Sequence, residues 1–239
     1  NPPFTQKWLS IRASASAKRS SVMRLSSRSS GNSRLMCASQ RDQACAAAGV
    51  DPATVLDALA AAPATSTPDW ATMAPEVLVD HLEATHHAYL HTELPRLTPL
   101  ADKVADVHGA RHPELAAVRD TYAELRAELE PHLMKEEQIL FPLIRELVAS
   151  AGTAEAHCGS LELGPIRVMM MEHDRAGELL AELREATGGY EVPDDGCASY
   201  RALYEGLAEL EADTHLHVHK ENNVLFPAVI ALEHATAAQ

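Results

Sequence analysis

Two segments of the chain carry nearly the same arrangement of histidine, lysine and glutamate before a Leu-Phe-Pro ending. The first is HLMKEEQILFP at residues 132–142 and the second is HVHKENNVLFP at residues 217–227, so equivalent positions are 85 residues apart. In each copy an imidazole and a carboxylate stand four residues apart, which places them on one face of a helix. Mixed nitrogen and oxygen donors of this kind suit iron. The repeat therefore predicts a metal site.

A further histidine precedes each copy at a matching distance, 45 residues before the first and 44 before the second. Such internal similarity indicates a duplicated pair of helices. The six candidate metal ligands are His87, His132, Glu136, His173, His217 and Glu221. Four imidazoles and two carboxylates suffice for two ions, with the glutamates bridging them. Zinc usually takes four ligands and calcium takes oxygen only, so both fit less well. The ferritin-like pattern uses Glu-x-x-His instead and is disfavoured.

Apolar residues continue the helix face that carries each His and Glu pair. Around the first copy these are Leu125, Leu129, Ile139, Leu140 and Leu143, and around the second they are Leu210, Val224 and Leu225. We therefore expect both pairs to point into the core. A lone carboxylate buried there costs several kcal/mol unless a proton or a metal neutralises it. Two divalent ions would remove that penalty.

Simpler interpretations compete with the metal site. A single histidine near a core is usually a structural residue, and one His-x-x-x-Glu pair is common on helix surfaces. Two copies in repeat register, each on an apolar face, favour metal binding instead.

The ligand from the first helix is not settled by periodicity. His81, His86, His87 and His91 all lie in that region, and the spacing does not separate His86 from His87.

Several neighbouring residues are weaker candidates. His215 and His219 are expected to point away from the site. Glu128 and Glu172 flank the ligands as ordinary polar residues or as proton relays, and His108 is a candidate auxiliary residue.

Four long helical stretches position these residues. We expect them at about 75–107 with bends at Pro95 and Pro99, at 113–150, from Pro165 to Gly188–Gly189, and from just after residues 193–196 to about His234. Glycine or proline marks each end, and short connections require antiparallel neighbours. The predicted fold is all-α, an antiparallel four-helix bundle spanning residues 75–235.

The N-terminal part has a different composition. Residues 41–62 predict two short helices, with a stop at Gly49 and with Asp51 capping a helix that starts at Pro52; residues 62–68 are a linker. Residues 1–40 are rich in Ser and Arg and lack acids and apolar periodicity, which predicts a disordered tail. Organelle transit peptides share that composition.

Charge and cysteine usage limit the function classes. Residues 1–41 hold eight Lys and Arg and no acid, so the remainder carries 12 Lys and Arg against 34 Asp and Glu, a net charge of −22. That charge disfavours nucleic-acid binding. No apolar run is long enough for a membrane span. The four cysteines are scattered, as in reduced proteins, and we expect a cytoplasmic location.

Four segments together resemble a known family. They are THHAYLHTELPRL (85–97), HLMKEEQILFP (132–142), MMMEHDRAGELLAELRE (169–185) and HVHKENNVLFP (217–227), and they are similar to the iron–sulfur cluster repair di-iron proteins, or RIC family, of the hemerythrin-like group. The resemblance implies two non-haem irons with oxo and carboxylate bridges. It also implies His87 as the first ligand, eight residues before Pro95. Residues 44–62 resemble the end of the family's small N-terminal domain, whose Cys-Cys-Gly-Gly motif is absent here.

The resemblance implies repair of iron–sulfur clusters damaged by oxidative or nitrosative stress, either by donating iron or by removing nitric oxide. Expected partners are damaged iron–sulfur proteins and small ligands such as O2 or NO, and a homodimer is compatible with the sequence. Alternatives are a di-iron nitric oxide reductase or peroxidase, and a hemerythrin-like carrier or sensor of oxygen or nitric oxide. A carrier typically has a fifth histidine, so the His/Glu symmetry argues against it. The sequence alone does not separate iron donation from catalysis.

Overall fold

The computed structural model describes residues 45–46, 49–54, 57, 70–150 and 160–237. The chain divides into two compact units, residues 1–66 and 67–239. In the first unit, residues 45–46, 52–54 and 57 are helical, and the backbone N–H of Ala53 donates to Asp51 Oδ1 at 3.1 Å, as expected of a helix cap. The predicted tail at 1–40 and the linker at 62–68 lie outside the described residues.

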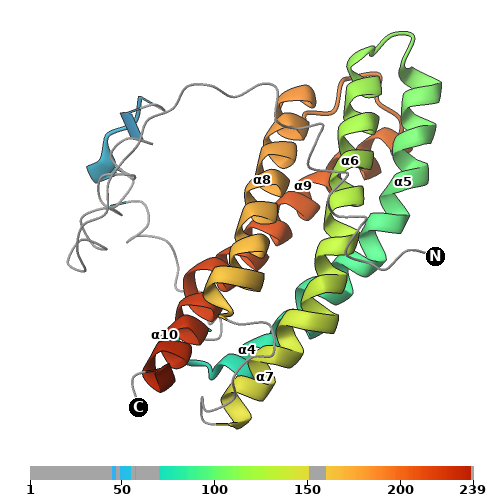
Figure 1. Cartoon of the computed structure of the whole chain (residues 1–239). Coiled ribbons are helices and arrows are strands. Elements are labelled where there is room, and N and C mark those ends of the chain that lie inside the picture. Colours follow the sequence, from blue (N-terminus) through green and yellow to red (C-terminus); the bar gives the residue numbers. More distant parts are fainter. Residues whose placement is uncertain (1–44, 47–48, 55–56, 58–69, 151–159, 238–239) are drawn as a thin grey trace, which may run out of the picture. The chain divides into compact units, whose positions relative to one another are not determined.

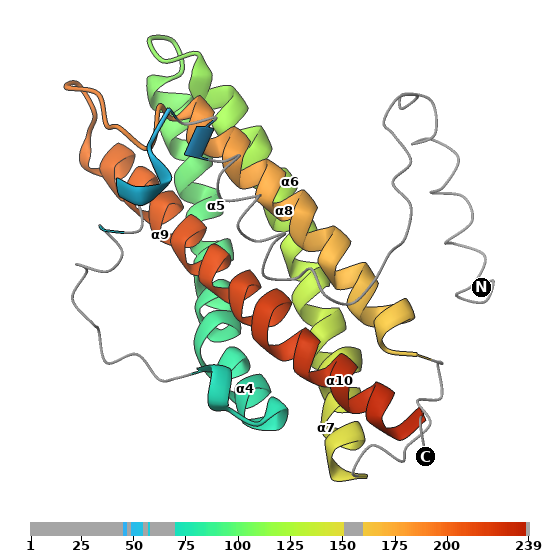
Figure 2. The same cartoon turned by 90° about the vertical axis from the view of Figure 1, so that its left-hand side faces the viewer.

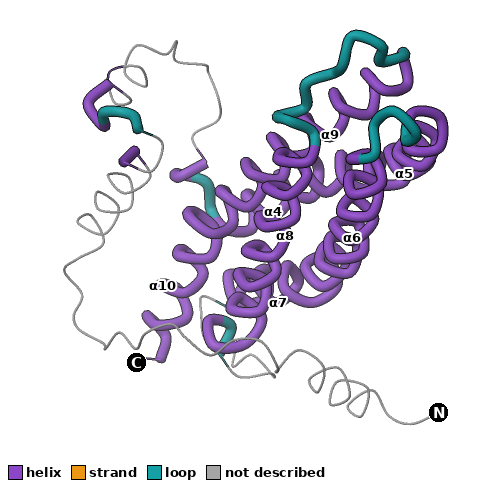
Figure 3. Tube along the Cα trace, turned by 90° about the horizontal axis from the view of Figure 1, so that it is seen from above, coloured by secondary structure: helices purple, strands orange, loops and turns teal. Residues whose placement is uncertain are grey.

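Every regular element among the described residues of the second unit is a helix (Figure 3). The first arm, after a short turn Trp70–Thr72, comprises α4 (Pro75–Leu82), a π-helical turn (Glu83–His87) and α5 (Ala88–His108). The second comprises α6 (Glu114–Lys135), a π-helical turn (Glu136–Leu140) and α7 (Phe141–Ala149). The third comprises a π-helical turn (Glu162–Ile166) and α8 (Arg167–Ala186). The fourth comprises α9 (Ala198–Lys220), a π-helical turn (Glu221–Leu225) and α10 (Phe226–Ala237).

The predicted all-α four-helix bundle is therefore confirmed. Figures 1 and 2 show α5, α6, α8 and α9 lying along one another, with α4, α7 and α10 extending the bundle at one end. Two details differ from prediction. The third arm begins before Pro165, which lies inside a π-helical turn. The first arm has a π-helical turn at Glu83–His87 that was not predicted, and Pro95 and Pro99, where bends are expected, lie inside α5.

Two apolar clusters make the core. One is built from α5, α6, α8 and α9 and includes the fully buried rings of Tyr122, Tyr200 and Tyr204. The other is built around α4, α7 and α10 and includes Phe141 and Phe226. The repeated His and Glu residues come from the helical segments between these clusters, so apolar packing flanks them along the bundle.

The π-helical turns of the second and fourth arms coincide with the Leu-Phe-Pro endings of the repeat. Phe141 N–H bonds the carbonyl of Glu136 five residues back, and Phe226 N–H bonds that of Glu221 in the same way. The next residue in each copy is a proline, which has no N–H and whose ring clashes with the carbonyl four residues back. The helix widens locally to accommodate this, and such turns are frequent at functional sites.

The wider turn changes which side chains reach the core. Ile139, predicted on the core face, is 52% exposed, and Leu143 is only partly buried. Leu140 is buried as predicted, and Ile144, which was not predicted, is buried as well. The prediction for Ile139 was wrong because it assumed regular α-helical spacing through residues 136–140.

Gly206 is where α9 packs closely against side chains of α5. A Cβ at this position would lie 2.6 Å from Leu97 Cδ2, closer than side-chain atoms pack. Within the described part of the chain, no helix combines the length and the apolar character that crossing a membrane requires.

Candidate metal centre

The four arms each contribute to one buried cluster of histidine and glutamate. The structure brings all six sequence-predicted residues together in two overlapping groups. One group is His87, Glu136, His217 and Glu221, and the other is His132, Glu136, His173 and Glu221. Within each group the potential ligand atoms lie within 4.8 Å of one another. Both glutamates belong to both groups, so the arrangement can hold two metal ions with the carboxylates between them.

Distances between the atoms show how the two carboxylates stand between pairs of imidazoles. Glu136 Oε2 lies 3.5 Å from His87 Nε2 and 3.3 Å from His132 Nε2. The second carboxylate, Glu221, lies 3.1 Å from the Nε2 atoms of both His173 and His217. Nε2 of His173 is also 3.2 Å from that of His132. All four imidazoles therefore aim Nε2 toward the same small region.

The cluster carries donor atoms that the protein itself leaves unsatisfied. Both carboxylates are fully buried, and the four imidazoles are at most 5% exposed. Neither oxygen of Glu136 makes a hydrogen bond within the described residues, and the same is true of His87 Nε2. Buried polar atoms are otherwise almost always satisfied, because leaving them unpaired is costly. Divalent cations would satisfy these atoms, so the residues present fit a pair of metal ions.

Burial also changes the proton affinities in the cluster. Burial and the neighbouring Glu221 carboxylate raise the pKa of Glu136 well above its usual range. Burial, reinforced by His217, lowers the pKa of His87 to about 4, so its ring stays neutral at physiological pH. A neutral imidazole is the form that binds metal, whereas a protonated carboxylate must release its proton first. Metal affinity should therefore fall as pH is lowered.

The outward nitrogen of three imidazoles is fixed by a polar partner. His87 Nδ1 donates to Glu137 Oε1 at 2.9 Å and His132 Nδ1 donates to Glu172 Oε2 at 3.0 Å. His173 Nδ1 donates to Asn222 Oδ1 at 2.9 Å. Such contacts fix the tautomer, so that Nε2 is free to bind a metal, and they orient the ring.

Glu137 provides a test of this support. We expect Glu137→Gln to fold normally and to weaken metal binding about 10- to 100-fold, the usual effect of removing a carboxylate behind a ligating histidine. The Glu137 carboxylate also accepts a hydrogen bond from His91 Nε2 at 2.7 Å, so it contacts two imidazole rings. Metal affinity measured by competition with a chelator reports the change. The matched control is Glu130→Gln, an exposed position on α6; equal weakening in both variants would contradict the support role.

His86, which periodicity did not separate from His87, takes a different position. Its Nδ1 lies 2.7 Å from Asp213 Oδ1 and its Nε2 lies 2.7 Å from Lys220 Nζ. The His86 ring therefore belongs to a polar network beside the cluster and to neither group. His215 is 58% exposed, away from the cluster.

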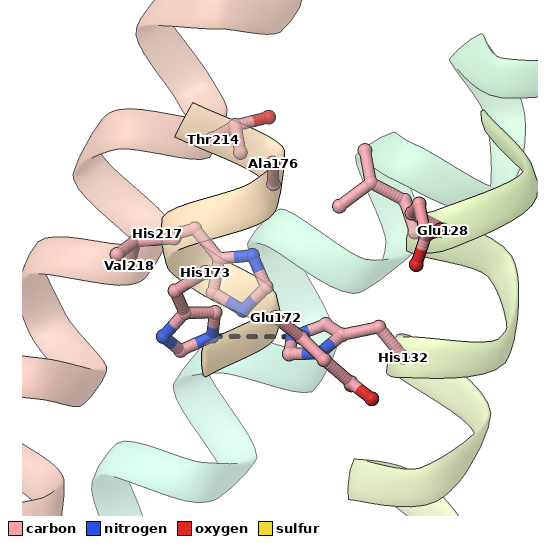
Figure 4. Close-up of a pocket in the computed structure, with 9 residues that line it drawn as sticks. Glu128, His132, Glu172, His173, Ala176, Thr214, His217 and Val218 are labelled. Atoms are coloured by element: carbon pink, nitrogen blue, oxygen red, sulfur yellow. Dashed lines mark hydrogen bonds and ion pairs between the residues drawn. The ribbon is translucent and has the colours of Figure 1, made fainter. Parts of the chain in front are cut away.

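The remaining candidates lie at different distances from the cluster. Glu172 contacts His132 and also pairs with Lys135. Glu128 lines a small cavity of about 10 Å³ beside His132, His173 and His217, with Thr214 and Val218 on its other side. Figure 4 shows these imidazoles converging there. His108 is at the far end of α5 and plays no part in the cluster.

Four residues that contact the histidines from neighbouring positions were not predicted from the sequence: Glu137, Asn222, Asp213 and Lys220. Glu137 and Asn222 follow a predicted ligand directly in the chain, at Glu136 and Glu221, and that adjacency was the only signal available. Their contacts are made across helices, so they depend on how the arms rotate against one another. The identification of the six residues as ligands stays a prediction that the geometry supports.

Comparison with known proteins gives two findings. Residues 78–229 match the hemerythrin HHE cation binding domain. The chain is 39% identical over 162 residues to a probable iron-sulfur cluster repair protein of Haemophilus influenzae, covering 68% of each chain. It is 39% identical over 165 residues to the iron-sulfur cluster repair protein YtfE of an Enterobacter species, and 38% identical to that of Escherichia coli O157:H7; these alignments cover 69% of this chain and 70% of each relative.

Proposed function

We propose that this chain repairs damaged iron–sulfur clusters with a di-iron centre. The premise is that the chain belongs to the hemerythrin HHE cation-binding family and to its iron–sulfur cluster repair proteins. The observation that carries the proposal is the pair of overlapping His/Glu groups. We assign the metal ligands as His87, His132, Glu136, His173, His217 and Glu221.

The donor set supports iron at both positions. Each group offers two imidazole nitrogens and two carboxylates that it shares with the other group, which makes a mixed N/O set of four ligand residues. Calcium and magnesium sites use oxygen ligands, whereas iron accepts imidazole together with carboxylate. A bound iron pair would supply redox chemistry and an exchangeable store of iron, and the six His and Glu residues would hold it.

The protein's own residues have three tasks in this proposal. The carboxylates of Glu136 and Glu221 offset part of the positive charge of the two ions, which lowers the cost of burying them. Glu137, Glu172 and Asn222 orient the imidazoles. The apolar clusters on either side limit the access of water, so that iron leaves only when the site is opened or its ligands are protonated.

A small-molecule reaction is the second candidate function. The cavity beside His132, His173 and His217 is about 10 Å³, which is the lower limit for one water molecule. A ligand that reaches the centre by this route must therefore be very small, and nitric oxide and dioxygen are the candidates of that class. Removal of nitric oxide at the centre would itself serve cluster repair, and reduction of nitric oxide or peroxide is the catalytic variant of the same proposal.

The test is to mix the iron-loaded protein with a cluster protein whose iron–sulfur centre has been damaged by nitric oxide, and to follow recovery of the cluster spectrum. We expect recovery with the iron-loaded protein and none with the metal-free protein. Nitric oxide consumption without transfer of isotopically labelled iron would favour the small-molecule reaction. Absence of both activities would contradict the proposal. Damaged iron–sulfur proteins are the proposed partners; the cytoplasmic location and a homodimer stay predictions.

A further inference from the structure

A cysteine and a histidine meet at the end of the bundle where α5 ends and α9 begins. Cys197 Sγ lies 3.1 Å from His108 Nε2. His108 is the last residue of α5, 21 residues after His87, which corresponds to about 30 Å along a helix. This pair is therefore separate from the metal centre. The loops that carry it are joined by an ion pair between Arg111 and Asp195, and both lie at the same end of the bundle in Figures 1 and 2.

The histidine of this pair is buried and aimed at the sulfur. His108 is 5% exposed, and its second nitrogen, Nδ1, makes no hydrogen bond within the described part of the chain. The Tyr200 ring packs edge-on against it with centroids 5.4 Å apart, which fixes its orientation. An apolar side chain would fill this position without burying an unpaired nitrogen, which costs free energy. A role toward Cys197 explains why an imidazole is there.

The cysteine is exposed and its sulfur is activated. Cys197 is the residue that precedes the first turn of α9, the 23-residue helix Ala198–Lys220. The backbone N–H of Tyr200, followed by the His108 ring, lowers the pKa of the thiol to about 7. The thiolate fraction at neutral pH is therefore larger than the few per cent of an ordinary cysteine.

An open cleft with a predominantly negative lining lies on the other side of residues that pack against His108; Cys197 and His108 do not line it themselves. Its volume is about 520 Å³, and His112 and Tyr200, which both pack against His108, form part of its wall. The other charged groups that line it are the carboxylates of Glu114, Glu185 and Glu191. His112 contacts Glu114 at 3.2 Å and Asp195 at 3.0 Å. The cleft therefore favours a ligand arm that carries a positive charge.

We propose that Cys197 and His108 form a thiol-modification site that exchanges with small disulfides bearing cationic arms. The Cys197 thiolate attacks one sulfur of the disulfide, and the disulfide bond breaks as a new sulfur–sulfur bond to Cys197 forms. The released half leaves as a thiolate and takes a proton from water. Cys197 is oxidised to a mixed disulfide and the released half is reduced, so atoms and electrons balance.

The test uses the full chain. Wild-type protein is treated at pH 7 and low ionic strength with cystamine, whose arms are ammonium groups, or with 3,3′-dithiodipropionate, whose arms are carboxylates. Peptide mass mapping separates modification of Cys197 from that of the other three cysteines, and urea-unfolded chain gives the reference rate. We expect Cys197 to react with cystamine about five-fold faster when folded, since a larger thiolate fraction outweighs lower intrinsic nucleophilicity. The rate with dithiodipropionate should increase less on folding than the rate with cystamine, and added salt should reduce the difference between the two disulfides.

Two variants separate the contributions of the pair and the cleft. His108→Gln should lower the folded rate toward the unfolded value with both disulfides, and iron content should not change. Glu191→Gln should reduce the preference for cystamine and leave the rate with uncharged 2-hydroxyethyl disulfide unaltered. If His108→Gln fails to fold, the rates of folded and unfolded wild-type protein with the two charged disulfides still test the proposal. A folded rate no higher than the unfolded rate, or equal gains with both charged disulfides, would overturn the proposal.

Discussion

Replacing His132 and His217 together by alanine is expected to remove more than about 90% of the metal bound by the wild-type protein. His132 belongs to one His/Glu group and His217 to the other, so each ion loses an imidazole. Changing a residue behind a ligand already costs about 10- to 100-fold in affinity, and losing a ligand costs more. Metal analysis after gel filtration gives the measurement, and circular dichroism checks that the helices remain.

His215→Ala is the matched control for the double variant. His215 lies on α9 only two residues from His217, but its side chain is 58% exposed and points away from the cluster. This variant should retain nearly all of the metal. Equal metal loss from His215→Ala, or a folded double variant that keeps two ions, would show that the centre is not built from these imidazoles.

Glu136→Gln is expected to keep the fold and to lose the magnetic coupling between the two irons, with repair activity lost as well. The Glu136 carboxylate belongs to both groups, and glutamine preserves its shape while removing its negative charge. Electron paramagnetic resonance together with iron analysis measures the coupling and the content. Glu146→Gln, at an exposed position on α7, is the control.

The metal-free forms separate a bridging role from a purely structural one. Without metal, the buried Glu136 is a cost to the fold, because burial and Glu221 disfavour its charge. Metal-free Glu136→Gln should therefore unfold at the same urea concentration as metal-free wild type, or at a higher one. Two coupled irons and normal repair in the folded variant would refute bridging by this carboxylate.

The fold and the cluster were largely predictable because the chain repeats itself. Two copies of His-x-x-Lys-Glu followed by Leu-Phe-Pro, each preceded by a histidine at matched distance, specify four arms and one shared face. The prediction needed only helical spacing and the cost of burying carboxylates. All six predicted residues meet in the structure for that reason.

Irregular helical turns limited how well the burial of individual side chains could be predicted. Regular spacing failed where Pro142 widens the helix, so Ile139 was placed in the core and is exposed. The same kind of turn at Glu83–His87 explains why periodicity did not separate His86 from His87.

Contacts between residues that are distant in the chain could not be predicted from the sequence either. His108 and Cys197 are 89 positions apart, and His86 and Lys220 are 134 apart. No local pattern in a single sequence links such pairs, since they depend on how far each arm is rotated about its axis.

The most direct test of the di-iron centre is metal analysis combined with Mössbauer spectroscopy on protein purified from iron-replete cells. Four imidazoles and two shared carboxylates are too many donors for one ion, so we expect about two irons per chain. In the oxidised protein they should be antiferromagnetically coupled ferric ions. One zinc per chain with no iron would contradict the di-iron centre.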